Sequence, residues 1–186
     1  RLCGSGFQAI VSAANAIQLG DADCAVGGGV ETMSRGGYLM PAARWGARMN
    51  DTKMIDMMVG ALHDPFDTVH MGIAAENIAS QFGFNREEQD AFAVASHQKA
   101  AAATDAGHFK SQIAPLEVVT KKGTTVIDTD EHFRRDASIE GMAKLRPVFK
   151  KDGSVTAGNA SGINDGAAAI VMMEAGAAAR AGAKPL

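Results

Sequence analysis

Residues 1–34 read RLCGSGFQAIVSAANAIQLGDADCAVGGGVETMS, and they decide the fold class that the sequence predicts. Cys3 stands directly before a Gly-Ser-Gly step and an apolar run. The glycines on either side of Ser5 permit backbone angles and close approaches that larger side chains forbid, so we expect Cys3 to lie at a tight turn. Such a turn would let another group come very near Cys3.

A helix and a strand are expected after this turn. Apolar residues recur at helical spacing from Phe7 to Ile17, and Gly20 follows where the helix would end. The next run, ADCAVGGGVETM, predicts a buried strand whose glycines pack close to another backbone. Cys3 would then lie at the N-terminus of a helix and Cys24 in the core, and the order of helix and strand indicates α/β architecture.

The rest of the chain alternates predicted elements with one long irregular stretch. Residues 33–60 are rich in Met, Gly and Arg without a sustained period, which is typical of an interaction arm or a lid. One helix is expected over 72–82, and a second runs from an N-cap at Asn85, with Glu88 completing a capping box, to Gly107. A hairpin of IAPLEVVT and TTVIDTDE follows, then a buried strand, GAAAIVMMEA, and an Ala-rich helix.

The composition excludes several classes of protein. The 186 residues are 46% hydrophobic and 21% charged, which predicts a soluble globular protein without a membrane partner. A formal net charge of −3 argues against nucleic-acid binding, which normally requires a basic patch. Two cysteines and no signal peptide predict a reducing, cytoplasmic location with Cys3 as a free thiol. Because an important turn lies at the very start, without a preceding Met, we expect the chain to be a piece of a longer protein.

The position of Cys3 favours a nucleophile. A helix N-terminus carries about half a positive charge, which stabilises a thiolate over a thiol. The N–H groups of the glycine turn would hold a carbonyl oxygen as negative charge develops on it. A single cysteine, however, is more often an ordinary buried residue. The assignment therefore needs support from other parts of the chain.

Six separated motifs provide that support, because they resemble the thiolase family in matching order over essentially the whole chain. The motifs are RLCGSGFQAI, GGGVETMS, HMG, REEQDAFAVASHQKA, KLRPVF and TAGNASGINDGAAA. Any one of them could arise by chance, whereas six in the same order are a specific signal. The resemblance is closest to the bacterial acetyl-CoA acetyltransferases, or β-ketothiolases.

The resemblance implies a role for individual residues. In thiolases the cysteine of the CGSG-type motif accepts the acyl group from acyl-CoA, so Cys3 is the implied catalytic residue. His70 and Met71 of the HMG motif are implied to contact the acyl and pantetheine groups. The other implied contacts with CoA are Arg134 at the nucleotide and Phe149, Ala157 and Ser161 along the pantetheine channel.

The resemblance also implies an architecture. We expect an α/β fold with part of a layered α/β/α core and a large inserted loop domain. Residues 1–32 and 164–186 would belong to the N-terminal core, and residues 33–163 would form the loop domain that covers CoA. Residues 38–60 would serve as an oligomerisation arm in a homodimer or homotetramer.

Parts of the thiolase pattern do not occur in this sequence. The family has a GHP-like histidine, a second cysteine in a Cys-x-Gly motif and an asparagine that orients water, all beyond the position matching Leu186. The strands that normally precede the nucleophile are missing too, so we expect the chain to cover about the middle half of an acyl-CoA acyltransferase of fatty acid metabolism, and to be inactive alone. CoA thioesters are the implied substrates, and no cofactor or metal is expected.

Other interpretations stay open. A non-catalytic acyl-CoA-binding or lipid-transfer relative would keep the substrate pocket without the chemistry, although Cys3 at the turn argues against this interpretation. A dinucleotide site at Gly4 to Gly6 lacks both a preceding strand and a third glycine at the required spacing. In isolation, His70 reads as a structural histidine, Arg134 beside Arg135 as a solvated pair and Ser161 as a turn residue. Four histidines show no metal-ligand spacing to one another: His63, His97, His108 and His132.

Overall fold

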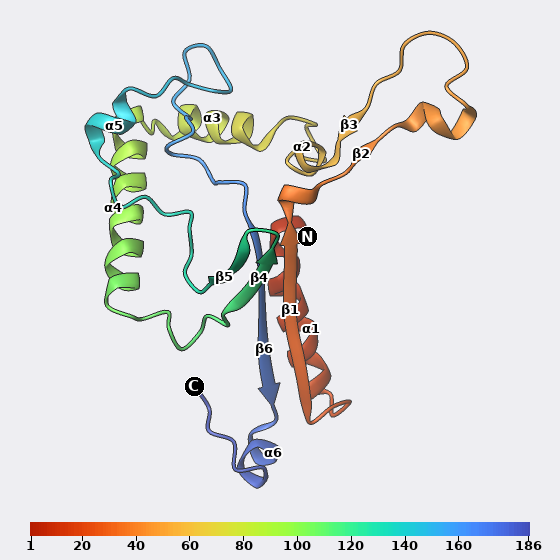
Figure 1. The fold of residues 1–186 in the computed structure, drawn as a ribbon, viewed down its shortest axis with the longest axis vertical. Coiled ribbons are helices and arrows are strands. Elements are labelled where there is room, and N and C mark those ends of the chain that lie inside the picture. Colours follow the sequence, from red (N-terminus) through yellow and green to blue (C-terminus); the bar gives the residue numbers. More distant parts are fainter. The chain divides into compact units, whose positions relative to one another are not determined.

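The computed structural model describes all 186 residues, and the chain forms two compact units (Figure 1). The first unit combines the two ends of the chain, Arg1–Ala61 and Ile163–Leu186, and the second unit is Leu62–Gly162. This division places residues 33–61 with the ends of the chain, whereas the sequence predicts one domain over residues 33–163.

The first unit contains short 3₁₀ turns, three helices and four strands. The 3₁₀ turns are η1 (Leu2–Gly4), η2 (Met33–Arg35) and η3 (Pro41–Trp45). The helices are α1 (Ser5–Gln18), α2 (Met57–Ala61) and α6 (Ala175–Arg180). The strands are β1 (Cys24–Thr32), β2 (Tyr38–Leu39), β3 (Ile55–Asp56) and β6 (Asp165–Met173).

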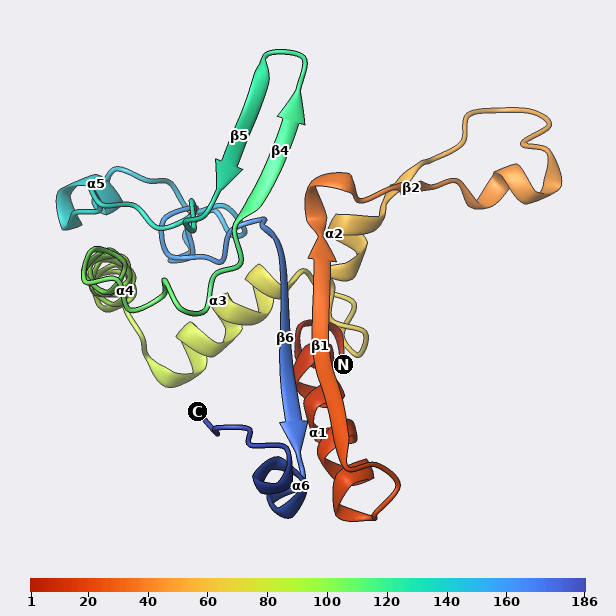
Figure 2. The same cartoon turned by 60° about the horizontal axis from the view of Figure 1, so that its bottom comes forward.

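The second unit contains three helices and one hairpin of two strands. Its helices are α3 (Met71–Phe82), α4 (Arg86–Asp105) and α5 (Ile139–Ala143), and its strands are β4 (Leu116–Thr120) and β5 (Gly123–Ile127). Strands β4 and β5 pair antiparallel as the predicted hairpin, from Leu116 opposite Ile127 to Thr120 opposite Gly123 (Figure 2). None of the helices in the structure combines the length and the hydrophobicity that crossing a membrane requires.

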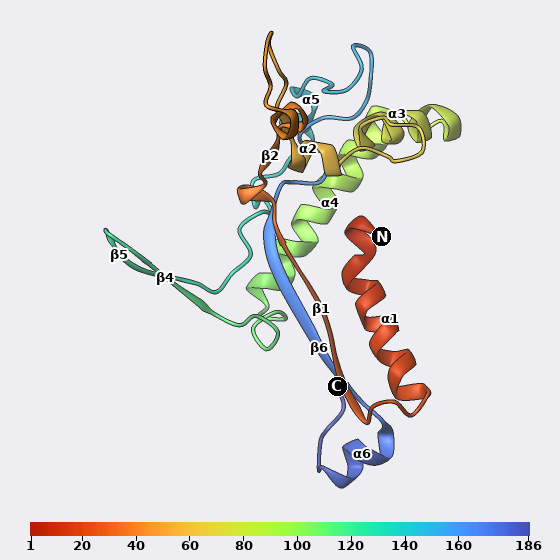
Figure 3. The same ribbon diagram turned by 90° about the vertical axis from the view of Figure 1, so that its right-hand side faces the viewer.

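Strands β1 and β6 form the frame of the first unit. They pair antiparallel, from Cys24 opposite Met173 to Thr32 opposite Asp165, and α1 runs along one face of the pair (Figure 3). A Cβ atom at Gly27 would lie 2.9 Å from Cα of Ile10, so the predicted close packing of the strand against another backbone is confirmed.

The expected burial of these strands is wrong. Gly27 is the only buried residue of β1, no residue of β6 is buried, and Cys24 is exposed. Each strand has a single strand neighbour, and α1 covers only one face of the pair. The apolar run therefore predicts the strand correctly, whereas its burial depends on elements that must pack on the other face.

The irregular stretch that the sequence predicts after β1 forms an extended arm (Figure 1, orange). Its base is the two-residue pairing of β2 with β3, Tyr38 opposite Asp56 and Leu39 opposite Ile55. Between these strands lie η3 and residues 46–54, which form no helix or strand. Large apolar side chains stay exposed here, with Trp45 at 81% and Met49 at 86% of their full surface.

The ends of α3 and α4 follow the sequence signals closely. Helix α3 stops at Gly83, which adopts the left-handed conformation with φ of 73°. Asn85 and Glu88 form the predicted capping box of α4, because each side chain accepts the backbone N–H of the other residue at 2.9 Å. Local hydrogen-bonding chemistry thus sets where these two helices begin and end.

Candidate active site

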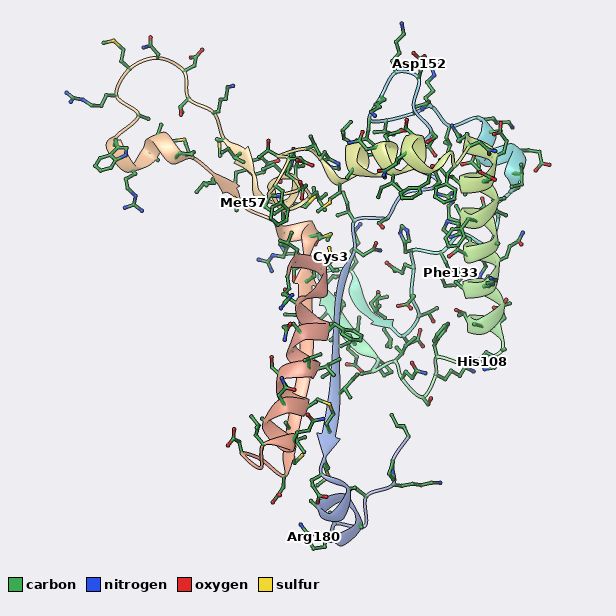
Figure 4. All side chains as sticks on the ribbon, turned by 180° about the vertical axis from the view of Figure 1, so that it is seen from behind. Cys3, Met57, His108, Phe133, Asp152 and Arg180 are labelled. Carbon is green, nitrogen blue, oxygen red and sulfur yellow. The ribbon has the colours of Figure 1, made fainter.

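Cys3 lies exposed in η1, immediately before the first turn of α1 (Figure 4). The tight turn is confirmed, but its left-handed residue is Leu2, with φ of 48°, rather than a glycine. The N–H groups of Gly4 and Ser5 donate to the carbonyls of Arg1 and Leu2, so these two groups are not free to hold a substrate oxygen as expected. No side chain caps α1 and its first turn holds no acidic residue, which leaves the partial positive charge of the helix end unopposed.

The glycines around Cys3 serve close packing. A Cβ atom at Gly29 in β1 would lie 3.2 Å from Cα of Gly6 in α1, closer than ordinary contacts allow. The two glycine-rich motifs of the sequence, CGSG and GGG, therefore meet at the start of α1. This contact fixes the turn that carries Cys3 against the frame of the first unit.

The HMG motif and Phe149 come together in the second unit. The ring of His70 stacks on the ring of Phe149, with centroids 4.7 Å apart and planes 27° apart. His70 Nδ1 accepts the N–H of Gly72 at 3.0 Å, so a neutral His70 carries its proton on Nε2. Met71 follows at the start of α3 and is exposed. A Cβ at position 72 would lie 2.2 Å from the Phe149 ring, so the motif needs its glycine.

Ala157 sits at the exposed tip of a turn whose interior is buried. Thr156 is fully buried, its N–H donates to Oδ1 of Asn159 at 2.7 Å, and its Oγ1 accepts the N–H of Gly158 at 3.2 Å. Ser161 follows this turn and is exposed. Two of the three residues implied to line the pantetheine channel therefore lie close together in the chain, Ala157 on this internally bonded turn and Ser161 just after it.

Arg134 and Arg135 have different surroundings. The backbone N–H of Arg134 donates to Nδ1 of His97 in α4 at 3.1 Å, and its side chain is 72% exposed. Arg135 instead places one nitrogen 2.7 Å from both carboxylate oxygens of Asp105, and its guanidinium lies 5.1 Å from the centre of the Phe133 ring. Arg135 therefore anchors the loop to α4, while the guanidinium of Arg134 reaches only the exposed carboxylate of Asp136, at 3.5 Å.

The site residues fall into the two units. Cys3 belongs to the first unit, and the six residues implied to contact substrate belong to the second. Within the second unit the structure joins His70 and Phe149 in a ring stack, and Met71 follows His70 directly in the chain. The structure contains no group of three or more His, Cys, Asp or Glu side chains that could hold a metal ion.

Sequence reasoning missed Glu76, Asp90 and Asn159, which hydrogen-bond to residues 154–156 or to one another. A signal for Glu76 exists, because it shares a helical face with the buried residues Gly72 and Ala79. A carboxylate on an otherwise small, buried helix face requires partners. Those partners lie far away in the sequence and are found only in the structure.

The comparison with protein families identifies the chain. The family model described as "Thiolase, N-terminal domain" matches residues 1–176. The chain therefore belongs to the thiolase family, as its motifs indicate, and its fold is part of the thiolase α/β fold.

Individual relatives agree with this assignment. The β-ketothiolase BktB of Cupriavidus necator is 61% identical over the whole chain, which spans 48% of that protein. The crystal structure of Bacillus anthracis acetyl-CoA acetyltransferase superposes with a TM-score of 0.94 at 44% identity, over 99% of this chain and 47% of the other. The structure of human mitochondrial 3-ketoacyl-CoA thiolase in complex with CoA superposes with a TM-score of 0.91 at 40% identity, over 99% of this chain and 46% of the other. The chain thus spans about half the length of the curated relatives it matches.

Proposed function

We propose that the complete gene product is an enzyme that transfers acyl groups between acyl-CoA molecules through an acyl-enzyme on Cys3. The reaction would be that of an acetyl-CoA C-acetyltransferase or, in reverse, a 3-ketoacyl-CoA thiolase. The observation that carries this proposal is the exposed Cys3 thiol at the uncapped N-terminus of α1, in a chain of the thiolase family.

The chemistry has two steps. The Cys3 thiolate attacks the carbonyl carbon of acyl-CoA, the new C–S bond forms, and CoA leaves as its thiolate. The carbanion of a second acetyl-CoA, formed by loss of a proton from its methyl group, then attacks the acyl-enzyme and releases Cys3 as a thiolate. The resemblance assigns the groups that move this proton to motifs that do not occur in these 186 residues.

The second unit would bind the CoA thioester. The Nε2–H of His70 is a hydrogen-bond donor, and Phe149 and Met71 provide apolar surface for the acyl and pantetheine chain. Ala157 and Ser161 would line the channel, and the guanidinium of Arg134 would meet the phosphates, since arginine suits phosphate recognition. A related structure, human mitochondrial 3-ketoacyl-CoA thiolase, contains CoA, which supports this class of ligand.

The arm would contribute to assembly. Residues 38–60 expose Tyr38, Trp45 and Met49, and aromatic and Met side chains are enriched in the cores of protein interfaces. We propose a homo-oligomer, a dimer or tetramer, whose contacts use this arm. The proposed location is the cytoplasm, where a free catalytic thiol stays reduced.

Selective alkylation tests the function. Cys24, at the start of β1, is the internal reference for this measurement. In the complete gene product at neutral pH, we expect iodoacetamide to label Cys3 first, and acetyl-CoA to protect it by occupying the pocket and acylating the sulfur. Peptide mapping measures both. Faster labelling of Cys24, or no protection by acetyl-CoA, would contradict the proposal, whereas protection without turnover would favour a non-catalytic acyl-CoA-binding protein.

A further inference from the structure

Two ionisable side chains of the second unit are almost completely buried. Glu76 in α3 is 5% exposed and Asp90 in α4 is 3% exposed. Carboxylates are rarely this buried unless they are paired or hydrogen-bonded, because an isolated buried charge is very unfavourable. Their partners lie on, or bond to, the segment 154–159, which carries Ala157 and precedes Ser161.

Glu76 binds the backbone at the start of this segment. Its carboxylate accepts the N–H of Ser154 at 2.9 Å and 3.0 Å and the N–H of Val155 at 2.8 Å, and it also accepts the hydroxyl of Ser154 at 3.2 Å. A Cβ at Gly153 would lie 2.2 Å from Oε1, so only glycine admits the carboxylate there. Burial acts to raise the pKa of Glu76, but the bonds from Ser154 and Val155 outweigh it, and the pKa lies below its usual range. Glu76 is therefore an anion at neutral pH.

Asp90 holds the other side of the segment through Asn159. The Asp90 carboxylate accepts Nδ2 of Asn159 at 2.9 Å and Nε of Arg86 at 2.6 Å. The Asn159 side chain also bonds back to the start of the segment, since Nδ2 donates to the carbonyl of Ser154 at 3.0 Å and Oδ1 accepts the N–H of Thr156 at 2.7 Å. The two carboxylates together fix the backbone on both sides of Ala157.

Arg86 links this arrangement to a further segment. Its terminal nitrogen donates to the carbonyl of Met142 at 2.6 Å and to that of Leu145 at 3.1 Å. Residues on α3, on α4 and after α5 are thus connected to one exposed turn. No buried side-chain nitrogen or oxygen in the structure lacks a hydrogen-bond partner, so the network is complete.

Stability alone does not account for two buried carboxylates. Apolar side chains of similar volume often give equal or greater stability at such positions. A carboxylate differs because it accepts several N–H groups at once and thereby selects one backbone conformation. In this structure, the backbone that the two carboxylates hold in one conformation is the turn that carries Ala157.

We propose that Glu76 and Asp90 are positioning residues for CoA binding, which hold residues 154–159 in the conformation that presents Ala157 and Ser161 to the pantetheine chain. The proposal rests on the proposed function. Neither carboxylate touches the ligand, and each acts through the backbone of the turn. Loss of either anion lowers the fraction of molecules with a binding-competent turn, and the apparent affinity falls by the same factor.

The test uses Glu76→Gln and Asp90→Asn in the complete gene product, with Glu87→Gln as the matched control, because Glu87 is exposed on the first turn of α4. The first measurement is the concentration of acetyl-CoA that halves the rate of Cys3 alkylation. The second is the KM and kcat of the acyl transfer. We expect both Glu76→Gln and Asp90→Asn to raise the half-protecting concentration and KM about tenfold, with kcat changed by less than about twofold.

The rate of Cys3 alkylation without acetyl-CoA distinguishes a positioning role from a general structural defect. We expect this rate to be the same in the two variants as in the wild-type protein. A folded variant with wild-type half-protection and KM would overturn the proposal. Where Glu76→Gln or Asp90→Asn does not fold, Asn159→Ala removes the link between Asp90 and the turn with less disturbance, and its half-protecting concentration and KM decide in the same way. A wild-type protein that acetyl-CoA does not protect would instead contradict the proposed function, and this proposal with it.

Discussion

Among single residues, Arg134 and Arg135 show how neighbours in a sequence acquire different roles. Arg135 is engaged with Asp105 and with the ring of Phe133, while the guanidinium of Arg134 meets only the exposed carboxylate of Asp136 at 3.5 Å. An exposed pair of this kind contributes little to stability. Arg134 can therefore exchange this partner for the phosphates of a ligand at small cost.

We expect Arg134→Ala to raise KM for CoA thioesters about tenfold and to leave kcat nearly unchanged, because it removes binding that ground state and transition state share. Steady-state kinetics on the complete gene product measure this. Arg180→Ala is the control, since it removes the same charge from α6 in the other unit. A fall in kcat at constant KM would place Arg134 in the chemistry instead.

The protonation of Glu76 gives a second residue-scale prediction. The pKa of Glu76 lies below its ordinary value of 4.5 in the folded chain, so its contribution to stability is complete above about pH 4.5 and is lost as the pH falls through the folded pKa. We expect Glu76→Gln to lower the free energy of unfolding by about 1–3 kcal/mol at pH 7. Urea unfolding should show this difference shrinking below pH 4.5. A difference that grows with acidity would rule out the assigned direction of the pKa shift.

Among elements, α4 is the helix with the most complete local start signal. Asn85 and Glu88 satisfy one another's backbone N–H groups, as their spacing predicts. We expect Asn85→Ala to lower the free energy of unfolding by about 1 kcal/mol, measured by urea unfolding. Gln98→Ala on the exposed surface of the same helix is the control. It should change the free energy of unfolding by much less, because glutamine and alanine are both good helix formers. Equal effects of the two substitutions would show that the capping box is not what stabilises α4.

The arm gives a prediction about assembly. Deleting Pro41 to Asp51 removes η3 and the exposed Trp45 and Met49, while the β2–β3 pairing at the base lies outside the deletion. If the arm carries contacts between copies, the oligomeric mass of the complete gene product should fall, as light scattering can measure. An unchanged mass would show that the copies associate elsewhere.

The elements also show what a sequence reveals about a fold and what it leaves out. The ends of α3 and α4 are predictable because Gly83 and the capping box act on residues within a few positions. Helix α5 is not predictable from hydrophobic periodicity, because five residues are too few to show a helical period. The predicted burial of β1 and β6 is wrong because the burial of a strand depends on which elements pack against it.

The candidate site follows the same rule. Cys3 stands out because its turn and helix N-terminus follow from adjacent residues, whereas the role of the HMG motif is implied by the resemblance to thiolases. The links of Glu76 to Ser154 and of His97 to Arg134 join residues 78 and 37 positions apart. No local pattern encodes such pairs, so the network that supports the turn at Ala157 emerges only from the folded chain.

At the scale of the whole molecule, the accessible surface is unusually large. The structure exposes 14517 Å², whereas two separate compact domains of these sizes would together expose about 10,000 Å². Large apolar side chains are part of this exposed surface, including Val26, Val30 and Val171 in the β1–β6 pair. Uncovered apolar faces and unpaired strand edges favour association with other chains.

We therefore expect a polypeptide of only these 186 residues to self-associate and to form no acetoacetyl-CoA from acetyl-CoA. Condensation needs a base for the carbanion and donors for the enolate oxygen, which the resemblance assigns to motifs absent from this sequence. Light scattering and a condensation assay measure the two properties. Activity above the blank that Cys3→Ala abolishes would show that these residues contain the complete machinery.

The pairing of β1 with β6 has a kinetic consequence. Ser34 donates its N–H and its hydroxyl to the carboxylate of Asp165, 131 positions along the chain, where the two strands meet. Joining such distant segments while the intervening chain is unfolded is entropically costly, and distant contacts slow folding. If the second unit, which lies between the two strands in the sequence, forms first, the loop to be closed is effectively much shorter. Pulsed hydrogen exchange during refolding should then protect the amides of α3 and α4 before those of β1 and β6.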